Sequence, residues 1–149
     1  MLQNIRKTLL NQYFKQVAVA TLLIILSWLI VFFQHTDSYS GNRTLSVILV
    51  SLSGVFGLAL PIFYRSYFIS GLKNAKTVSI ESFMNFEKNT IKIALIAPYF
   101  LILSIALHLS ERTHILIFLF SLYALYYYYP SNKKIKFEMK IFRINQKNK

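Results

Sequence analysis

The stretch "VAVATLLIILSWLIVFF", from Val17 to Phe33, carries no charged residue and decides the class of fold. A membrane-spanning helix needs roughly 20 predominantly apolar residues, with a range of about 17 to 25. Continuous apolar residues without strict alternation favour a helix over a strand. Within a bilayer, only helices and closed barrels satisfy all backbone hydrogen bonds. The stretch therefore predicts a transmembrane helix at 17–33.

Three further apolar runs follow in this chain of 149 residues, 55% of which are hydrophobic. We predict spans at about 45–64, 91–109 and 113–129, which gives an all-α fold, a four-helix transmembrane bundle that forms one domain. Lys92 is the one charged residue in these three runs, and it lies near a helix start, where its ammonium can reach the headgroups. A cleavable signal peptide is the alternative for the first run, but signal cores have only about 7–15 apolar residues.

The distribution of positive charge predicts the orientation of the spans. The net charge is +12, and fifteen of the seventeen Lys and Arg residues lie before the first run, in the middle loop and its margins (which include Lys92 at the start of the third run), or after the fourth run. Arg43 and Arg112 are the other two. The positive-inside rule then places both termini, the middle loop and the tail 130–149 in the cytoplasm (N-in/C-in). The charge also predicts contact with anionic lipids at the cytoplasmic face. Nucleic acid is not an expected partner, since no binding motif accompanies the charge.

The middle loop contains a pattern typical of a short helix. Ile80, Phe83 and Met84 recur at helical spacing, and Ser79 precedes them as a candidate N-cap. We expect a short amphipathic segment on the cytoplasmic surface of the membrane that leads into the third span.

The basic C-terminal tail has a different pattern. Ile135, Phe137, Met139 and Ile141 alternate with polar residues, which is typical of a strand. A lone strand has no pairing partner here, so a solvated tail is the alternative interpretation.

The junction before this tail predicts a membrane exit. Amphipathic tyrosine rings favour headgroup depth, and lysines favour the cytoplasmic side. The stretch "YYYYPSNKKIKFEM" (126–139) resembles the end of small four-helix bacterial membrane proteins that have no established activity, and this resemblance implies the same architecture in a bacterial cytoplasmic membrane. The predicted interface residues are Tyr126, Tyr127, Tyr128, Tyr129, Lys133 and Lys134.

Small residues in the second span indicate close helix packing. Ser53 and Gly57 form a small-xxx-small pair, which lets another helix approach closely. Packing within the bundle is the first interpretation; a homo-oligomer contact or a membrane-protein partner is the alternative. A channel or transporter lined by Ser46, Ser53, Gly57 and Ser104 is a further alternative.

Few residues suggest chemistry. The candidate metal ligands are His35, His108, His114 and Glu111, at the predicted outer face, but their spacing matches no rigid ligand motif, so we expect polar anchors and no metal or cofactor. No acidic residue lies inside a predicted span, and the chain has no cysteine. We therefore expect a non-enzymatic multi-pass membrane protein without catalytic residues, acting as an accessory or scaffold subunit. The alternative is a small oligomeric channel or transporter.

Overall fold

The computed structural model describes residues 2–33, 42–71, 78–142 and 144, and all regular structure within these ranges is helical. The helices are α1 (Leu2–Phe33), α2 (Arg43–Gly54), η1 (Val55–Ala59), α3 (Leu60–Gly71), α4 (Ile80–Ala94), α5 (Ala97–Ala106), α6 (Glu111–Tyr127) and α7 (Asn132–Ile141). This confirms the all-α fold class.

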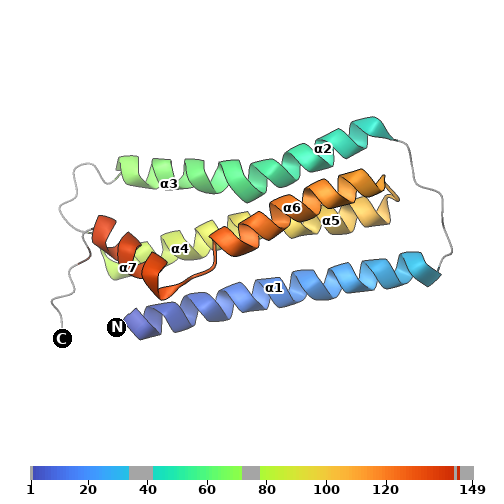
Figure 1. Ribbon diagram of the computed structural model, residues 1–149. Helices are drawn as coiled ribbons and strands as arrows, with labels where there is room; N and C mark the ends of the chain where they lie inside the picture. Colours follow the sequence, from blue (N-terminus) through green and yellow to red (C-terminus); the bar gives the residue numbers. More distant parts are fainter. Residues whose placement is uncertain (1, 34–41, 72–77, 143, 145–149) are drawn as a thin grey trace.

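The long helices lie side by side and alternate in direction (Figure 1). The N-terminal end of α1, the C-terminal end of α3, the N-terminal end of α4 and the whole of α7 share one end of the molecule, which we call the α7 end. Three helical stretches are long and apolar enough to cross a membrane: Leu2–Phe33, Arg43–Gly71 and Ile80–Ala106. Their outer faces carry many exposed large hydrophobic side chains. An apolar surface of this extent is typical of contact with lipid or another protein.

The first helix begins well before the predicted start of its span. Helix α1 extends without interruption from Leu2, and its first turns bury Ile5, Leu9 and Tyr13. These side chains pack against α4 and α7 in the largest apolar cluster. The basic segment before Val17 is therefore part of the folded helix, because every third or fourth residue in it has an apolar neighbour to contact.

A widened turn joins α2 to α3 into one long helical segment. The N–H of Leu60 donates to the carbonyl of Val55, which is the i to i−5 bond of a π-helix. Pro61 follows at once and lacks an N–H, and its ring would clash with the carbonyl four residues earlier. A single π-helical turn accommodates this clash without ending the helix.

Pro98 has a stronger effect on the third long segment. Helix α4 ends at Ala94, and α5 begins at Ala97 after the turn at Leu95 and Ile96. The proline occupies the first turn of α5, where a missing N–H leaves no hydrogen bond unmade. The third long helical segment therefore has a short break at Leu95 and Ile96.

The predicted segment before the third span is the first part of α4. Ser79 caps it, and its side chain accepts a hydrogen bond from the N–H of Ser82 at 3.2 Å. Its apolar face does not lie open on one side of the molecule, because Phe83 and Phe86 are buried against α1, α3 and α7. We therefore correct the expected surface position: this face packs inside the protein.

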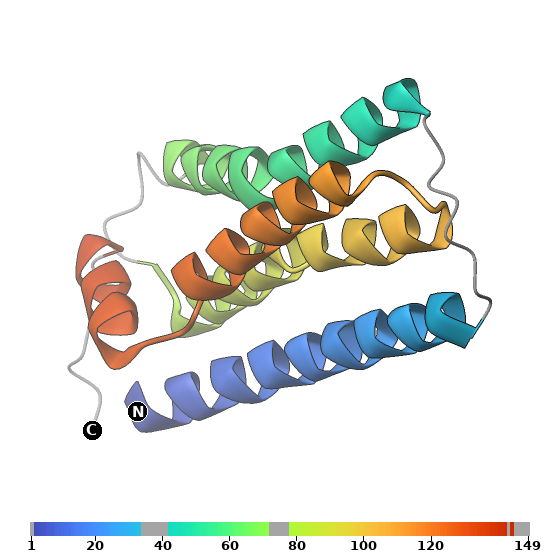
Figure 2. The same ribbon diagram turned by 45° about the vertical axis from the view of Figure 1, so that its right-hand side comes forward.

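The strand pattern of the tail was misleading. Residues 132–141 form the helix α7, which lies across the end of the other helices (Figures 1 and 2). Its buried side chains are Ile135, Glu138 and Met139, and Phe142 follows just beyond the helix. This spacing of three to four residues is helical, and Phe137 and Ile141 are left exposed. The neighbouring helices cover only one side of the segment. A helix places Ile135, Met139 and Phe142 on that side, and this favours the helix over the strand that the alternating pattern indicated.

Candidate functional site

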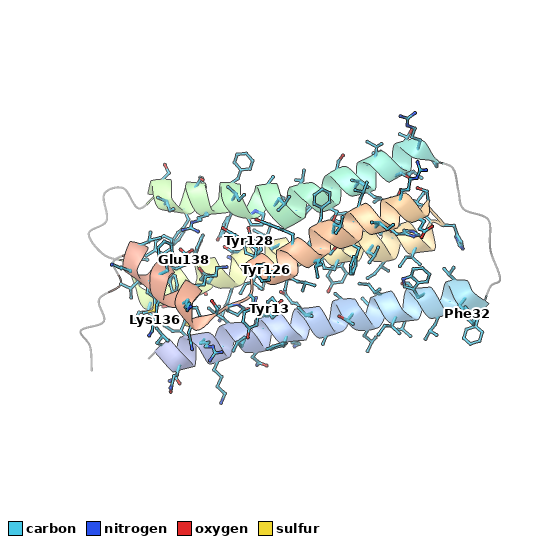
Figure 3. All side chains as sticks on the ribbon, in the orientation of Figure 1. Tyr13, Phe32, Tyr126, Tyr128, Lys136 and Glu138 are labelled. Atoms are coloured by element: carbon cyan, nitrogen blue, oxygen red, sulfur yellow. The ribbon has the colours of Figure 1, made fainter. Side chains whose placement is uncertain are left out.

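Four charged side chains from three helices meet at the α7 end. Arg65 comes from α3, Glu87 from α4, and Lys134 and Glu138 from α7. All four line one small pocket of about 30 Å³. Figure 3 shows Glu138 at this end, opposite the end that carries Phe32. We call these four residues the charge cluster; it contains two basic and two acidic side chains.

An ion pair between Arg65 and Glu138 joins α3 to α7. The distance between Arg65 Nη1 and Glu138 Oε1 is 2.8 Å, and the two side chains are 33% and 4% exposed. No group within the described ranges hydrogen-bonds to Oε2 of Glu138. A carboxylate this deeply buried is stable only when it is paired. The pair therefore fixes where α7 lies on the other helices.

Lys134 completes the cluster from the same face of α7. Its Nζ donates to the carbonyl of Tyr127 at 3.3 Å and lies 4.9 Å from the centre of the Tyr128 ring, within the range of a cation–π contact. Burial lowers the pKa of the Lys134 ammonium below 10.5, and the carboxylates of Glu87 and Glu138 partly oppose this shift. The aromatic ring and the carboxylates thus offset some of the cost of removing this cation from water.

Local sequence explains why α7 presents these side chains together. Pro130 cannot continue α6, and Ser131 then caps α7 by accepting a hydrogen bond from the N–H of Lys134 at 3.2 Å. Lys134 and Glu138 are four residues apart, so they lie on one face of the helix. Ile135 and Met139, one residue further on, are buried beside them.

Aromatic side chains pack at the same end of the molecule, and one of them, Phe86, lines the pocket of the charge cluster. The rings of Phe68 and Phe86 stack with their centres 4.4 Å apart, and Phe142 contacts both rings edge-on at 5.5 Å. Tyr13 on α1 donates a hydrogen bond to the carbonyl of Leu125 at 2.9 Å. These contacts bring α1, α3, α4, α6 and the tail together at one end.

The predicted metal candidates do not assemble into a site. Among the described residues, no group of three or more His, Asp or Glu side chains could hold a metal ion, and His35 lies outside those residues. His114 contacts Trp28 edge-on, with ring centres 6.4 Å apart, and Glu111 is exposed in the first turn of α6.

His108 has a backbone role. Its φ of 49° is left-handed, and it follows the end of α5. The N–H of His108 donates to Ile105, and that of Leu109 to Ser104, at 3.0 and 3.1 Å. These two bonds form a Schellman motif, which closes the end of a helix.

The predicted small-residue pair lies where three helices meet. A Cβ added to Gly57 would be 3.3 Å from Cβ of Ala97 on α5 and 3.5 Å from the carbonyl oxygen of Phe120 on α6. Ser53 is fully buried one turn earlier, and Ser104 is fully buried with its hydroxyl donating to Leu101. Ser46 is half-buried. The fully buried serines and Gly57 lie in close helix contacts, so they do not line an open passage within one chain.

The predicted interface residues divide between surface and interior. Tyr126 is 85% exposed, whereas Tyr128 is 4% exposed and packs against Ala94 and Ala124. Tyr127, Tyr129 and Lys133 are exposed, and Lys134 turns into the charge cluster. All six residues were predicted to lie at the depth of the lipid headgroups. Tyr128 and Lys134 instead contact other residues of the protein.

The charge cluster suits a structural role better than a reaction. A pocket of about 30 Å³ can hold a water molecule, since about 10–15 Å³ is enough for one. Pockets that bind small-molecule ligands are usually about 300–1,000 Å³. No known family model, curated protein or solved structure matches this chain. The interpretation of the site therefore rests on its geometry.

Sequence reasoning missed three of the four members of the charge cluster. Arg65, Glu87 and Glu138 lie in the predicted middle loop and tail, where the sequence indicates no role for them beyond their charge. One available signal was Glu138, the only acidic residue of a tail with many lysines. Glu138 lies four residues after Lys134 and next to Met139, so in a helix these side chains would share one face. The alternating hydrophobic residues indicated a strand and concealed this helical spacing.

Proposed function

We propose that the chain is a four-span protein of a bacterial cytoplasmic membrane, with both termini inside, that acts as an accessory or scaffold subunit without catalysing a reaction. The spans are the apolar parts of α1, of α2 to α3, of α4 to α5, and α6. Helix α6 has 17 residues and is about 26 Å long at 1.5 Å per residue, slightly less than the ~30 Å hydrocarbon core. Its exposed tyrosines extend it into the interface.

The arrangement of charge around the helices is the observation that carries this proposal. The alternating helix directions bring the Lys and Arg residues of α1, α3, α4 and α7 toward one end. Arg43 and Arg112 are at the starts of α2 and α6, at the other end. This asymmetry supports an inside orientation of the α7 end.

The outer face of α7 is the surface that we assign to a partner. Phe137 is 61% exposed, and Lys133, Lys136 and Lys140 are exposed around it, whereas the inner face is held by the charge cluster and the aromatic side chains. A rigidly held helix with an exposed aromatic ring and a basic rim suits an acidic protein surface or an anionic membrane surface.

Site-specific photocrosslinking in living cells tests this role. A benzoylphenylalanine at position 137 should give one or a few discrete protein adducts. The matched control is the same group at Phe63 of α3, which is 69% exposed on a predicted span and should give mainly lipid adducts. Position 137 without protein adducts would contradict the scaffold role. Solute or ion flux through reconstituted vesicles would favour the channel alternative.

A further inference from the structure

Glu87 is a buried member of the charge cluster that has no ion-pair partner among the described residues. Its side chain comes from α4 and is 5% exposed. The two cations of the pocket are engaged elsewhere. Arg65 pairs with Glu138 at 2.8 Å, and Lys134 donates to the carbonyl of Tyr127 at 3.3 Å. A carboxyl group that is buried without a cation is more stable neutral than charged.

The pocket beside Glu87 also contains an acceptor without a donor. Oε2 of Glu138 is buried, and no donor among the described residues reaches it. Both carboxyl groups line the same pocket of about 30 Å³, which has room for one water molecule. A protonated carboxyl group can donate one hydrogen bond, whereas an ionised one can only accept. A proton on Glu87 therefore supplies, through one water, a donor for Oε2.

The groups that face Glu87 come from three other segments. They are Arg65 on α3, Tyr127 and Tyr128 at the end of α6, and Lys134 and Glu138 on α7. Helix α1 also packs against α4, but among the described residues none of its side chains lines the pocket. Glu87 precedes the predicted third span at 91–109. Burial raises the pKa of its carboxyl group from 4.5 to about 7; Lys134 and Arg65 oppose this rise, and Glu138 adds to it.

We propose that Glu87 binds a proton and that this proton controls how firmly α7 is attached. In the proton-bound form, the carboxyl O–H of Glu87 donates through one water to Oε2 of Glu138. When the proton leaves to the solvent, the pocket holds a second carboxylate that has no ion pair. Detachment of α7 opens the pocket and exposes this carboxylate to water, so loss of the proton favours detachment. This inference does not rest on the membrane location, since it concerns contacts within the folded chain.

The direction of the pH dependence follows from the linkage between proton binding and attachment. A group that binds its proton more tightly in the attached form stabilises that form fully below its pKa in the detached form. This contribution is lost as the pH rises through the pKa of the attached form. With pKa values of 4.5 when detached and about 7 when attached, the ratio of detached to attached α7 should rise by up to roughly 40-fold from pH 5 to pH 7.

Nuclear magnetic resonance of the glutamate carboxyl groups tests the proton site directly. The glutamates of the chain are Glu81, Glu87, Glu111 and Glu138. The side-chain carboxyl carbons are labelled with carbon-13, and each signal is followed against pH in the full chain in detergent. The signal that is absent in Glu87→Gln should titrate with a midpoint closer to 7 than to 4.5. A midpoint closer to 4.5 would overturn the proposal.

A buried thiol tests the coupling to α7, because the chain has no cysteine of its own. Met139→Cys places a thiol on the buried face of α7, and Phe137→Cys places one on its exposed face. The ratio of their reaction rates with a maleimide follows the detached population, since the pH dependence of the thiol itself cancels.

Two glutamine variants complete the thiol experiment. The rate ratio should rise from pH 5 to pH 7 in the protein with all four glutamates and in Glu81→Gln, which removes an exposed carboxyl group from the same helix. It should not rise in Glu87→Gln, which resembles the proton-bound form and is therefore expected to fold. A ratio that stays constant with all four glutamates present, or one that still rises in Glu87→Gln, would contradict control by this proton.

Discussion

Removal of Arg65 should release α7 from the rest of the molecule. The substitution Arg65→Met keeps much of the aliphatic side chain but leaves the carboxylate of Glu138, which is 4% exposed, without its partner at 2.8 Å. Breaking a buried ion pair on one side costs about 3–5 kcal/mol. At about 1.4 kcal/mol per factor of ten, the population with α7 detached should rise roughly 10²- to 4 × 10³-fold.

The two members of the pair should not be equivalent. Arg65 is 33% exposed, so in Glu138→Gln its guanidinium can regain contact with water, and the effect should be smaller than in Arg65→Met. The double variant Arg65→Met/Glu138→Met replaces the pair by apolar groups. Such replacements are often neutral or stabilising, so this variant should recover most of the lost stability.

A reporter thiol measures detachment, because the chain has no cysteine of its own. Met139→Cys places a buried thiol on the inner face of α7, and its rate of reaction with a maleimide in detergent or vesicles follows the detached population. All variants carry this substitution, so its own cost cancels. Arg43→Met, at the other end, is the matched loss of charge and should leave the rate unchanged. A rate for Arg65→Met within threefold of the background, or a double variant as reactive as Arg65→Met, would refute the account.

Three further predictions concern the helix ends, the close contact and the pH dependence of stability. His108→Gly should raise the melting temperature by relieving about 1 kcal/mol of left-handed strain, whereas His114→Gly, inside α6, should lower it; the reverse order would contradict the Schellman assignment. Gly57→Leu should lower the free energy of unfolding by about 1–3 kcal/mol or more, because the larger side chain overpacks the helix contact. Gly71→Ala, where an added Cβ would have no neighbour within 4 Å, should leave it nearly unchanged. Thermal unfolding in detergent measures both. Because burial lowers the pKa of Lys134, only the unfolded state holds this proton between the lowered pKa and 10.5, so stability should rise with pH across that window. Lys134→Met should remove this contribution to the slope of melting temperature against pH, and an unchanged slope would count against a buried ammonium.

Sequence patterns predicted the apolar helices well, because their signal is local. Hydrophobic runs such as 17–33 indicate a helix regardless of neighbours, and the cap at Ser79 needs only the residues that follow it. Pro98 also acts locally, so a distortion near it could be expected. The sequence did not predict that α1 extends back to Leu2, since this part of the helix depends on apolar partners from α4 and α7.

The charge cluster depends on tertiary contacts and was therefore hidden. Arg65, Glu87 and Glu138 lie in segments far apart in the sequence, and each one alone is an ordinary charge outside a predicted span. The tail is a second example. Its alternating hydrophobic residues indicate a strand, but the segment forms a helix because the rest of the protein covers only one of its sides. Where the sequence of a short segment fits both a strand and a helix, tertiary packing decides which of the two forms.

The orientation of the helix ends tests the central claim most directly. Single cysteines at Asn42, Glu111, Glu81 and Lys133, all exposed positions, can be labelled in intact cells with a maleimide that does not cross membranes. We predict labelling of positions 42 and 111 from outside, and labelling of positions 81 and 133 only after the membrane is permeabilised. Labelling of position 133 in intact cells would contradict the four-span topology and the inside location of α7.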